Sequence, residues 1–159
     1  MTRRLQTGLV LTLVLVGGAV AFYLGARSGS RRVAADDEGV KLLGEKRYAE
    51  AVAKYEAVVA SDPRNEFAWY QLASASRNAG NCERALAAYR RYIEVAPARN
   101  EPYYGMGVCQ QKLGDRAGAL VSFRRFVANA KPPESAYVAH AKAMIAALEA
   151  GTAGASDAR

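Results

Sequence analysis

The sequence has few of the residues from which catalytic and metal sites are usually built. Its 159 residues include one histidine, His140, and two cysteines, Cys82 and Cys109. His140 has no cysteine or carboxylate four positions before or after it, as a pair of metal ligands on one helix face would require. The chain also lacks a Gly-x-Ser-x-Gly motif, a phosphate-binding Gly-Lys-Ser/Thr loop and a cysteine–histidine nucleophile pair. We therefore predict that the protein is not an enzyme and has no metal, cofactor or small-molecule substrate.

Acidic residues are absent from the first 32 positions, where five arginines lie. The net charge of +7 therefore belongs mainly to the N-terminus, because the remaining chain carries 17 of the 22 lysines and arginines against all 15 acids. Sequence-independent binding of nucleic acid needs a concentrated positive field, which a nearly neutral body does not supply. We predict no nucleic-acid partner.

Charged residues are also absent from Leu5 to Ala26. At about 1.5 Å per residue a helix of this length spans roughly 33 Å, enough to cross the hydrocarbon core of a bilayer. Residues 1–4 form a basic flank before this run, and residues 27–32 form a short linker after it. We predict a single-pass membrane anchor with the N-terminus in the cytoplasm and the rest of the chain in the periplasm.

Two alternatives to this anchor remain open. Ala19-Val20-Ala21 fits the small-residue pattern of a signal-peptide cleavage site, and cleavage after Ala21 would release a soluble periplasmic protein. Arginines also flank the apolar run on both sides, so the positive-inside rule does not fix its orientation. The same chain would then be a cytosol-facing adaptor tethered to the inner side of the membrane.

The rest of the chain repeats with a period of 34 residues. The repeating positions are small at Gly39, Ala73 and Gly107, alanine at Ala51, Ala85 and Ala119, aromatic at Tyr55, Tyr89 and Phe123, and proline at Pro63 and Pro97. A small residue, then Ala-x-x-x-aromatic, then proline is typical of the tetratricopeptide repeat, and the sequence resembles that family over residues 32–133. The small residues are expected where the two helices of a repeat approach each other closely.

The resemblance implies an all-α fold, a right-handed superhelix of about seven helices. The domain is predicted to span residues 33–150, with repeats at 32–65, 66–99 and 100–133 and a capping helix at 134–150. Tyr137, Val138, Ala141, Met144, Ile145 and Leu148 are expected on the packed side of this helix. The last residues, 151–159, show no periodicity, and we predict a disordered tail.

Arginine pairs stand between aromatic residues in two similar octapeptides, at residues 87–94 and 121–128. This arrangement is also found in proteins that bind single-stranded nucleic acid. On a helix, however, Tyr89 and Tyr92 share one face while Arg90 and Arg91 turn away from it. We interpret the rings as core residues and the arginines as solvated residues of the outer surface.

A stack of helix pairs has a concave surface formed by the first helix of each pair, and a peptide or a partner helix can bind there. By analogy with the family, the inward positions are Phe67, Tyr70, Ser74, Arg77, Asn78, Glu101, Tyr104, Val108, Gln111, Lys112 and Lys142. Aromatic rings suit apolar side chains of a peptide, amides suit its backbone, and basic groups favour acidic segments. Tyr70 and Tyr104 are expected to be surface rings that contribute little to the core, whereas Phe67 is equally expected to pack against the neighbouring repeat.

The resemblance implies a scaffold or adaptor that binds protein or peptide partners. Combined with the predicted anchor, it suggests a role in the bacterial cell envelope, in assembly or secretion. Cys82 opens the second helix of repeat two and Cys109 lies in the first helix of repeat three, so we expect them to be neighbours. In an exported protein such a pair favours a disulfide, and the alternative is two buried free thiols.

Overall fold

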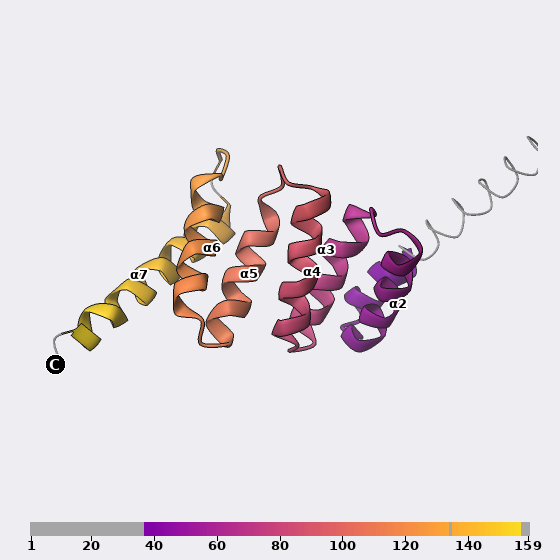
Figure 1. Cartoon of the computed structure of the whole chain (residues 1–159), viewed down its shortest axis with the longest axis horizontal. Coiled ribbons are helices and arrows are strands. Elements are labelled where there is room, and N and C mark those ends of the chain that lie inside the picture. The colour runs from indigo at the N-terminus through magenta and orange to yellow at the C-terminus, as the bar shows by residue number, and fades with distance from the viewer. Residues whose placement is uncertain (1–36, 134, 157–159) are drawn as a thin grey trace, which may run out of the picture. The chain divides into compact units, whose positions relative to one another are not determined.

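The computed structural model describes residues 37–133 and 135–156, and every regular element in this part is an α-helix (Figure 1). None of the helices within these two ranges is long and apolar enough to cross a membrane. The predicted anchor at residues 5–26 lies outside the described residues, as do the basic flank at 1–4 and the linker at 27–32.

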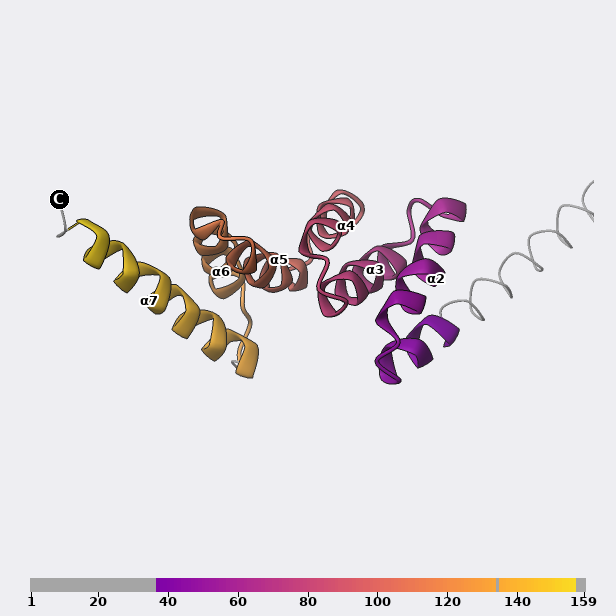
Figure 2. The same ribbon diagram turned by 90° about the horizontal axis from the view of Figure 1, so that it is seen from below.

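Seven helices follow one another in the described part of the chain, as the repeat pattern predicts. Residues 37–44 are helical. The six helices after them are α2 (Tyr48–Ser61), α3 (Glu66–Asn78), α4 (Cys82–Val95), α5 (Glu101–Lys112), α6 (Arg116–Ala128) and α7 (Ala136–Ser156). From α2 onward each helix packs against the next along the chain, and α3 also contacts α5 (Figures 1 and 2). The first helices of repeats two and three, α3 and α5, therefore lie beside each other, which is the arrangement a shared binding surface needs.

Local sequence sets the helix boundaries. The side chains of Asn65, Asn81 and Asp115 each accept a hydrogen bond from a backbone N–H in the first turn of the helix that follows. Gly80 and Gly114 have positive φ angles of 87° and 78°, the left-handed conformation that closes α3 and α5. The turns at Gly80-Asn81 and Gly114-Asp115 therefore separate the two helices of repeats two and three.

Large buried rings face small residues within each repeat. Tyr55, Tyr89 and Phe123 are almost completely buried, at 0%, 1% and 0% exposure. A Cβ atom placed on Gly39 would lie 2.5 Å from Cζ of Tyr55, and one on Gly107 would lie 2.7 Å from Cδ1 of Phe123. The predicted close approach of the two helices at these glycines is therefore confirmed.

A second glycine of α5 makes a contact between repeats. A Cβ atom on Gly105 would lie 2.2 Å from Oη of Tyr89, which belongs to α4 of the preceding repeat. The 34-residue period did not reveal this contact, because Gly105 has no small counterpart in the same column of repeat two, where Gln71 stands. Gly105 thus lets α5 approach α4 across the boundary between repeats two and three.

The last helix differs from its predicted bounds. It begins at Ala136 and ends at Ser156, so the predicted tail is wrong for residues 151–156, which are helical. Alanine has the highest helix propensity, and the alanine-rich sequence of α7 carries the helix through Gly151. Residues 157–159 lie outside the described part.

One side of α7 closes the stack against α5 and α6. Ala141 is buried in a cluster with Ala119 and Phe123, and three partly buried side chains of α7 pack against it: Met144, Ile145 and Leu148. Tyr137 was predicted on this packed side, but it is 62% exposed. Its ring lies against the edge of Tyr104, with centroids 5.0 Å apart, and so stays at the surface instead of entering the cluster.

Candidate functional site

The predicted groove residues lie on the first helices of repeats two and three, α3 and α5, and on the capping helix α7. The set divides into Phe67, Tyr70, Ser74, Arg77 and Asn78 on α3, Glu101, Tyr104, Val108, Gln111 and Lys112 on α5, and Lys142 on α7. Six of them are exposed, among them Phe67 at 41%. The other five are half-buried, so every predicted position retains some exposed surface. We refer to these eleven residues as the groove.

The aromatic residues of the groove rest on the core rings beneath them. Tyr70 lies 5.4 Å from Tyr92 between ring centroids, and 6.3 Å from Tyr89. Phe67 meets Tyr55 of repeat one edge-on at 6.3 Å, as the alternative for this residue predicts. Each ring therefore exposes one part to solvent and packs the other against a neighbour.

Tyr104 is the most connected ring of the groove. Its centroid lies 6.1 Å from Phe123, 5.4 Å from Phe126 and 5.0 Å from Tyr137. Tyr70 and Tyr104 were expected to contribute little to the core, and that expectation is wrong because both are half-buried against core rings. Their replacement by alanine would change the fold and the groove together, so exposed neighbours are better probes of binding.

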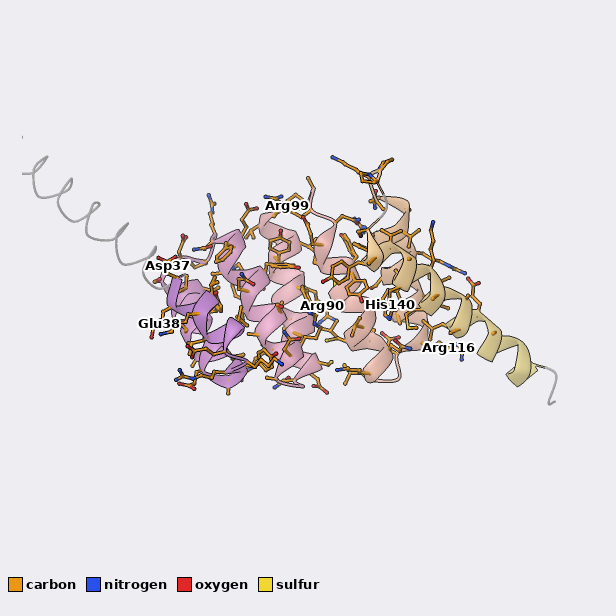
Figure 3. All side chains as sticks on the ribbon, turned by 180° about the vertical axis from the view of Figure 1, so that it is seen from behind. Asp37, Glu38, Arg90, Arg99, Arg116 and His140 are labelled. Carbon is orange, nitrogen blue, oxygen red and sulfur yellow. The ribbon has the colours of Figure 1, made fainter. Side chains whose placement is uncertain are left out.

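His140 joins α7 to the groove, although the repeat pattern does not predict a role for it there. Its Nδ1 lies 3.0 Å from the Tyr104 hydroxyl oxygen, a hydrogen bond between α5 and α7 (His140 is labelled in Figure 3). Tyr137 precedes His140 by three positions and so shares its helix face. Together these two side chains extend the aromatic surface of the groove from α5 onto α7.

The arginine pairs lie on the second helices, away from the groove. Arg91 forms an ion pair with Glu94 of its own helix, and Arg124 pairs with Glu149 of α7 at 2.6 Å. Arg90 is exposed, whereas Tyr89 beside it is buried. The interpretation of these octapeptides as core rings with solvated arginines is confirmed.

The two cysteines are neighbours across the boundary between repeats two and three. Both are buried free thiols in the structure. Burial, together with the neighbouring Cys82 thiol, raises the pKa of the Cys109 thiol to about 12. The expected proximity is confirmed, while the disulfide stays a prediction that alkylation of the non-reduced, denatured protein checks.

The free energy of unfolding should fall as the pH rises above about 9 under reducing conditions. Burial raises the pKa of Cys109 to about 12 from 9.0, and it raises the pKa of Tyr89 well above 10.0. Above these ordinary values the unfolded chain loses protons that the folded chain keeps, so each group lowers stability by about 1.4 kcal/mol per pH unit. Denaturant unfolding at pH 8 and pH 10.5 measures this. Equal midpoints would contradict the burial of both groups.

A cavity of about 590 Å³ is separate from the groove except at one residue. It lies between residues 97–100, which follow α4, and residues 129–133, which follow α6. Glu101 is the one groove residue on its wall. On the same wall, Cζ of Arg125 lies 4.3 Å from the centroid of the Tyr103 ring, so a cation–π pair lines part of the cavity. Pro133 and Ser135 are also on the wall, and the residue between them lies outside the described part of the chain.

Comparisons with known proteins agree with this geometry. Two sequence profiles described as tetratricopeptide repeat match residues 42–106 and 103–131. A comparison with curated protein sequences gave no match.

Several solved structures share the fold. PcrH of Pseudomonas aeruginosa, bound to the chaperone-binding region of PopD, has a TM-score of 0.68 and 23% identity, covering 73% of this chain and 89% of PcrH. SycD, a type III secretion translocator chaperone of Yersinia enterocolitica, has a TM-score of 0.71 and 14% identity, and the match covers 74% of this chain and 83% of SycD. The Sgt2 repeat domain of Aspergillus fumigatus has a TM-score of 0.68 and 17% identity, and the match covers 80% of this chain and 82% of the Sgt2 domain. At these identities the similarity shows the fold.

Proposed function

Because residues 42–131 belong to the tetratricopeptide-repeat family, we propose that this protein is a non-catalytic adaptor or chaperone that holds an extended segment of a partner protein in the groove. The observation that carries the proposal is the row of partly exposed aromatic side chains on successive first helices. Phe67 is 41% exposed, and Tyr70 and Tyr104 are half-buried. Apolar side chains of a partner would lose water contact on these rings.

Polar groups beside the rings suit a peptide backbone. Asn78 of α3 and Gln111 of α5 are both exposed in the last turns of their helices. A side-chain amide both donates and accepts hydrogen bonds, so it can pair with the N–H and C=O groups of an extended chain. Solved proteins of this fold support the proposal, since PcrH is bound to a region of PopD and SycD to a peptide of YopD.

The groove proposal is tested by capture of partners from native membranes with the full-length protein. Replacement of both amides, Asn78→Ala with Gln111→Ala, should weaken capture about tenfold or more, because each lost hydrogen bond is worth about 0.5–1.5 kcal/mol. Both residues are exposed, so the thermal midpoint should stay near that of the wild type. Arg90→Ala, on the exposed side of α4, is the matched control and should leave capture unchanged. Capture lost in Arg90→Ala and kept in the amide variant would overturn the proposal.

For the location, we propose retention in the membrane through residues 5–26, with the groove in the periplasm and a role in assembly or secretion in the cell envelope. The apolar run of the sequence supports this. Carbonate washing of native membranes should leave the full-length chain in the pellet. A mature N-terminus at Phe22, detected by intact-mass measurement, would contradict the anchor and favour a soluble periplasmic protein cleaved after Ala21. Two freely alkylated cysteines would favour the cytosol-facing alternative.

A further inference from the structure

The cavity beside α5 and α6 has buried apolar side chains on its floor and exposed charged side chains on its rim. Tyr103 and Val138 on its wall are 7% and 3% exposed. Three charged residues of the wall are exposed: Glu101, Arg125 and Lys131. The segments that follow α4 and α6, which bound the cavity, lie along the same edge of the stack (Figure 1). Its volume of about 590 Å³ is in the range of small-molecule sites, roughly 300–1,000 Å³.

The side chain of Asn100, also on the wall, has a hydrogen-bond partner for its nitrogen but not for its oxygen. The N-cap side chains of α3, α4 and α6 accept a bond from their own helix, whereas Asn100 precedes α5 without such a bond. Its Nδ2 donates to the carbonyl oxygen of Phe126 at 2.8 Å, which fixes the orientation of the amide. Its Oδ1 is buried, and no group in the described part of the chain donates a hydrogen bond to it. A buried acceptor without a donor is costly, so a donor in the cavity would stabilise it.

Arg125 contributes hydrogen-bond donors from the last turn of α6. Its Cζ lies 4.3 Å from the centroid of the Tyr103 ring, so the ring holds the guanidinium on the wall of the cavity. It forms no ion pair with a carboxylate among residues 37–133 and 135–156, whereas its neighbour Arg124 pairs with Glu149. A guanidinium without a carboxylate partner still has N–H donors to offer to an anion.

The polar groups of the wall divide into acceptors from one element and donors from another. Asn100 and Glu101 place an amide oxygen and a carboxylate at the start of α5. Arg125, near the end of α6, and Lys131, just after it, contribute two cations. The cavity therefore offers acceptors for a cationic group and donors for an anionic group, together with an apolar floor.

We propose that the cavity binds a small zwitterion, an α-amino acid or a dipeptide with a large apolar side chain. Its ammonium group pairs with the Glu101 carboxylate and with Oδ1 of Asn100. Its carboxylate pairs with Arg125 and Lys131, and its side chain lies on the apolar floor. The proposal does not depend on the groove, because Glu101 is the one residue that the two sites share. The sequence alone predicts no small-molecule ligand, since the wall comes from α5, α6 and α7, which only the fold brings together.

The probes are L-phenylalanine and the dipeptide leucyl-phenylalanine. Each is titrated into the full-length protein in detergent micelles and followed through the NMR signals of the probe, with empty micelles as the blank. Saturable binding with a dissociation constant of about 0.1–1 mM is expected for so small a ligand. The two probes differ in the distance between ammonium and carboxylate, so the tighter one identifies whether the ligand is an amino acid or a dipeptide.

Blocked forms of the same probe test its two charges separately. N-acetylation removes the ammonium charge and C-terminal amidation removes the carboxylate. Each change should weaken binding to the wild-type protein about tenfold or more, because hydrogen bonds between charged groups are the strong ones.

Substitutions on the wall assign each charge to its side of the cavity. Arg125→Gln with Lys131→Gln should make the free acid and the amidated probe bind equally. Glu101→Gln, alone and with Asn100→Ala, should reduce the preference for the free ammonium over the acetylated probe. The single variant keeps the test valid if loss of Asn100 unfolds the chain. Two exposed residues of α4 supply matched controls that should keep both preferences: Arg90→Gln and Glu83→Gln.

Three results would overturn the inference. The first is no saturable binding of either zwitterion up to about 10 mM. The second is equal binding of the zwitterion and both blocked forms, which would mean that the cavity binds through apolar contact alone. The third is a preference for the free carboxylate that survives Arg125→Gln with Lys131→Gln, because the carboxylate would then lie elsewhere. Each result leaves the groove proposal intact, since partner capture tests that proposal separately.

Discussion

Phe123→Ala is expected to lower the free energy of unfolding by about 3–5 kcal/mol, the usual cost of removing a fully buried aromatic ring. Phe123 lies on α6, is 0% exposed, and points its ring towards α5 and α7. Ala119 and Ala141 complete the buried cluster around it. Such a loss is a large fraction of the roughly 5–15 kcal/mol that stabilises a domain. Because α7 packs on this cluster, the capping helix should become more accessible to proteases in the same variant.

Val121→Ala is the matched control for this prediction. Val121 lies two residues before Phe123 on α6 and is 66% exposed. Its replacement should change the free energy of unfolding by less than about 0.5 kcal/mol. Denaturant titration followed by circular dichroism measures both variants. A small effect of Phe123→Ala, close to that of the control, would mean that the ring is not in the core.

Gly105→Ala should destabilise the fold by about 2 kcal/mol, even though alanine favours a helix more than glycine by about 1 kcal/mol. The added Cβ would lie 2.2 Å from Oη and 2.3 Å from Cζ of Tyr89. Tyr89 is 1% exposed, so its ring has no free space into which it can move. The steric cost therefore exceeds the gain in helix propensity.

Gly44→Ala makes the same chemical change where there is space. Gly44 is helical and exposed, and a Cβ atom there would have no neighbour within 4 Å. Helix propensity alone then applies, and this variant should be as stable as the wild type or more stable by about 0.5–1 kcal/mol. Thermal unfolding of the two variants compares them directly. A Gly105→Ala variant that gains stability like the control would show that α4 and α5 are not in close contact.

The repeat pattern predicted the fold because the same buried contact, between a small residue and an aromatic ring, recurs in the core every 34 residues. Gly39 and Gly107 recur with Tyr55 and Phe123 since each small residue makes room for the ring of its own repeat. Contacts between repeats do not follow this period. Gly105 meets Tyr89 at one boundary, and Gln71 occupies the corresponding position of the previous repeat. Contacts between repeats are therefore identified from the three-dimensional structure and not from the spacing of residues in the sequence.

The register of the repeats placed ten of the eleven groove residues on α3 and α5, but it could not predict how deeply each side chain lies. Tyr70 and Tyr104 are half-buried because core rings lie beneath them. His140 reaches Tyr104 from α7, a helix that no repeat pattern aligns with the others. The wall of the cavity comes from three helices that only the fold brings together. None of these properties follows from spacing along the chain.

Site-specific photo-crosslinking in the native cell tests most directly whether a partner segment occupies the groove. A benzophenone amino acid at Gln111 of the full-length protein is exposed on the groove side of α5, and the same group at Arg90 is exposed on α4. We predict a discrete crosslinked adduct with a partner from position 111 and none from position 90. An adduct from position 90 alone would contradict the account and place the partner on the outer side of the stack.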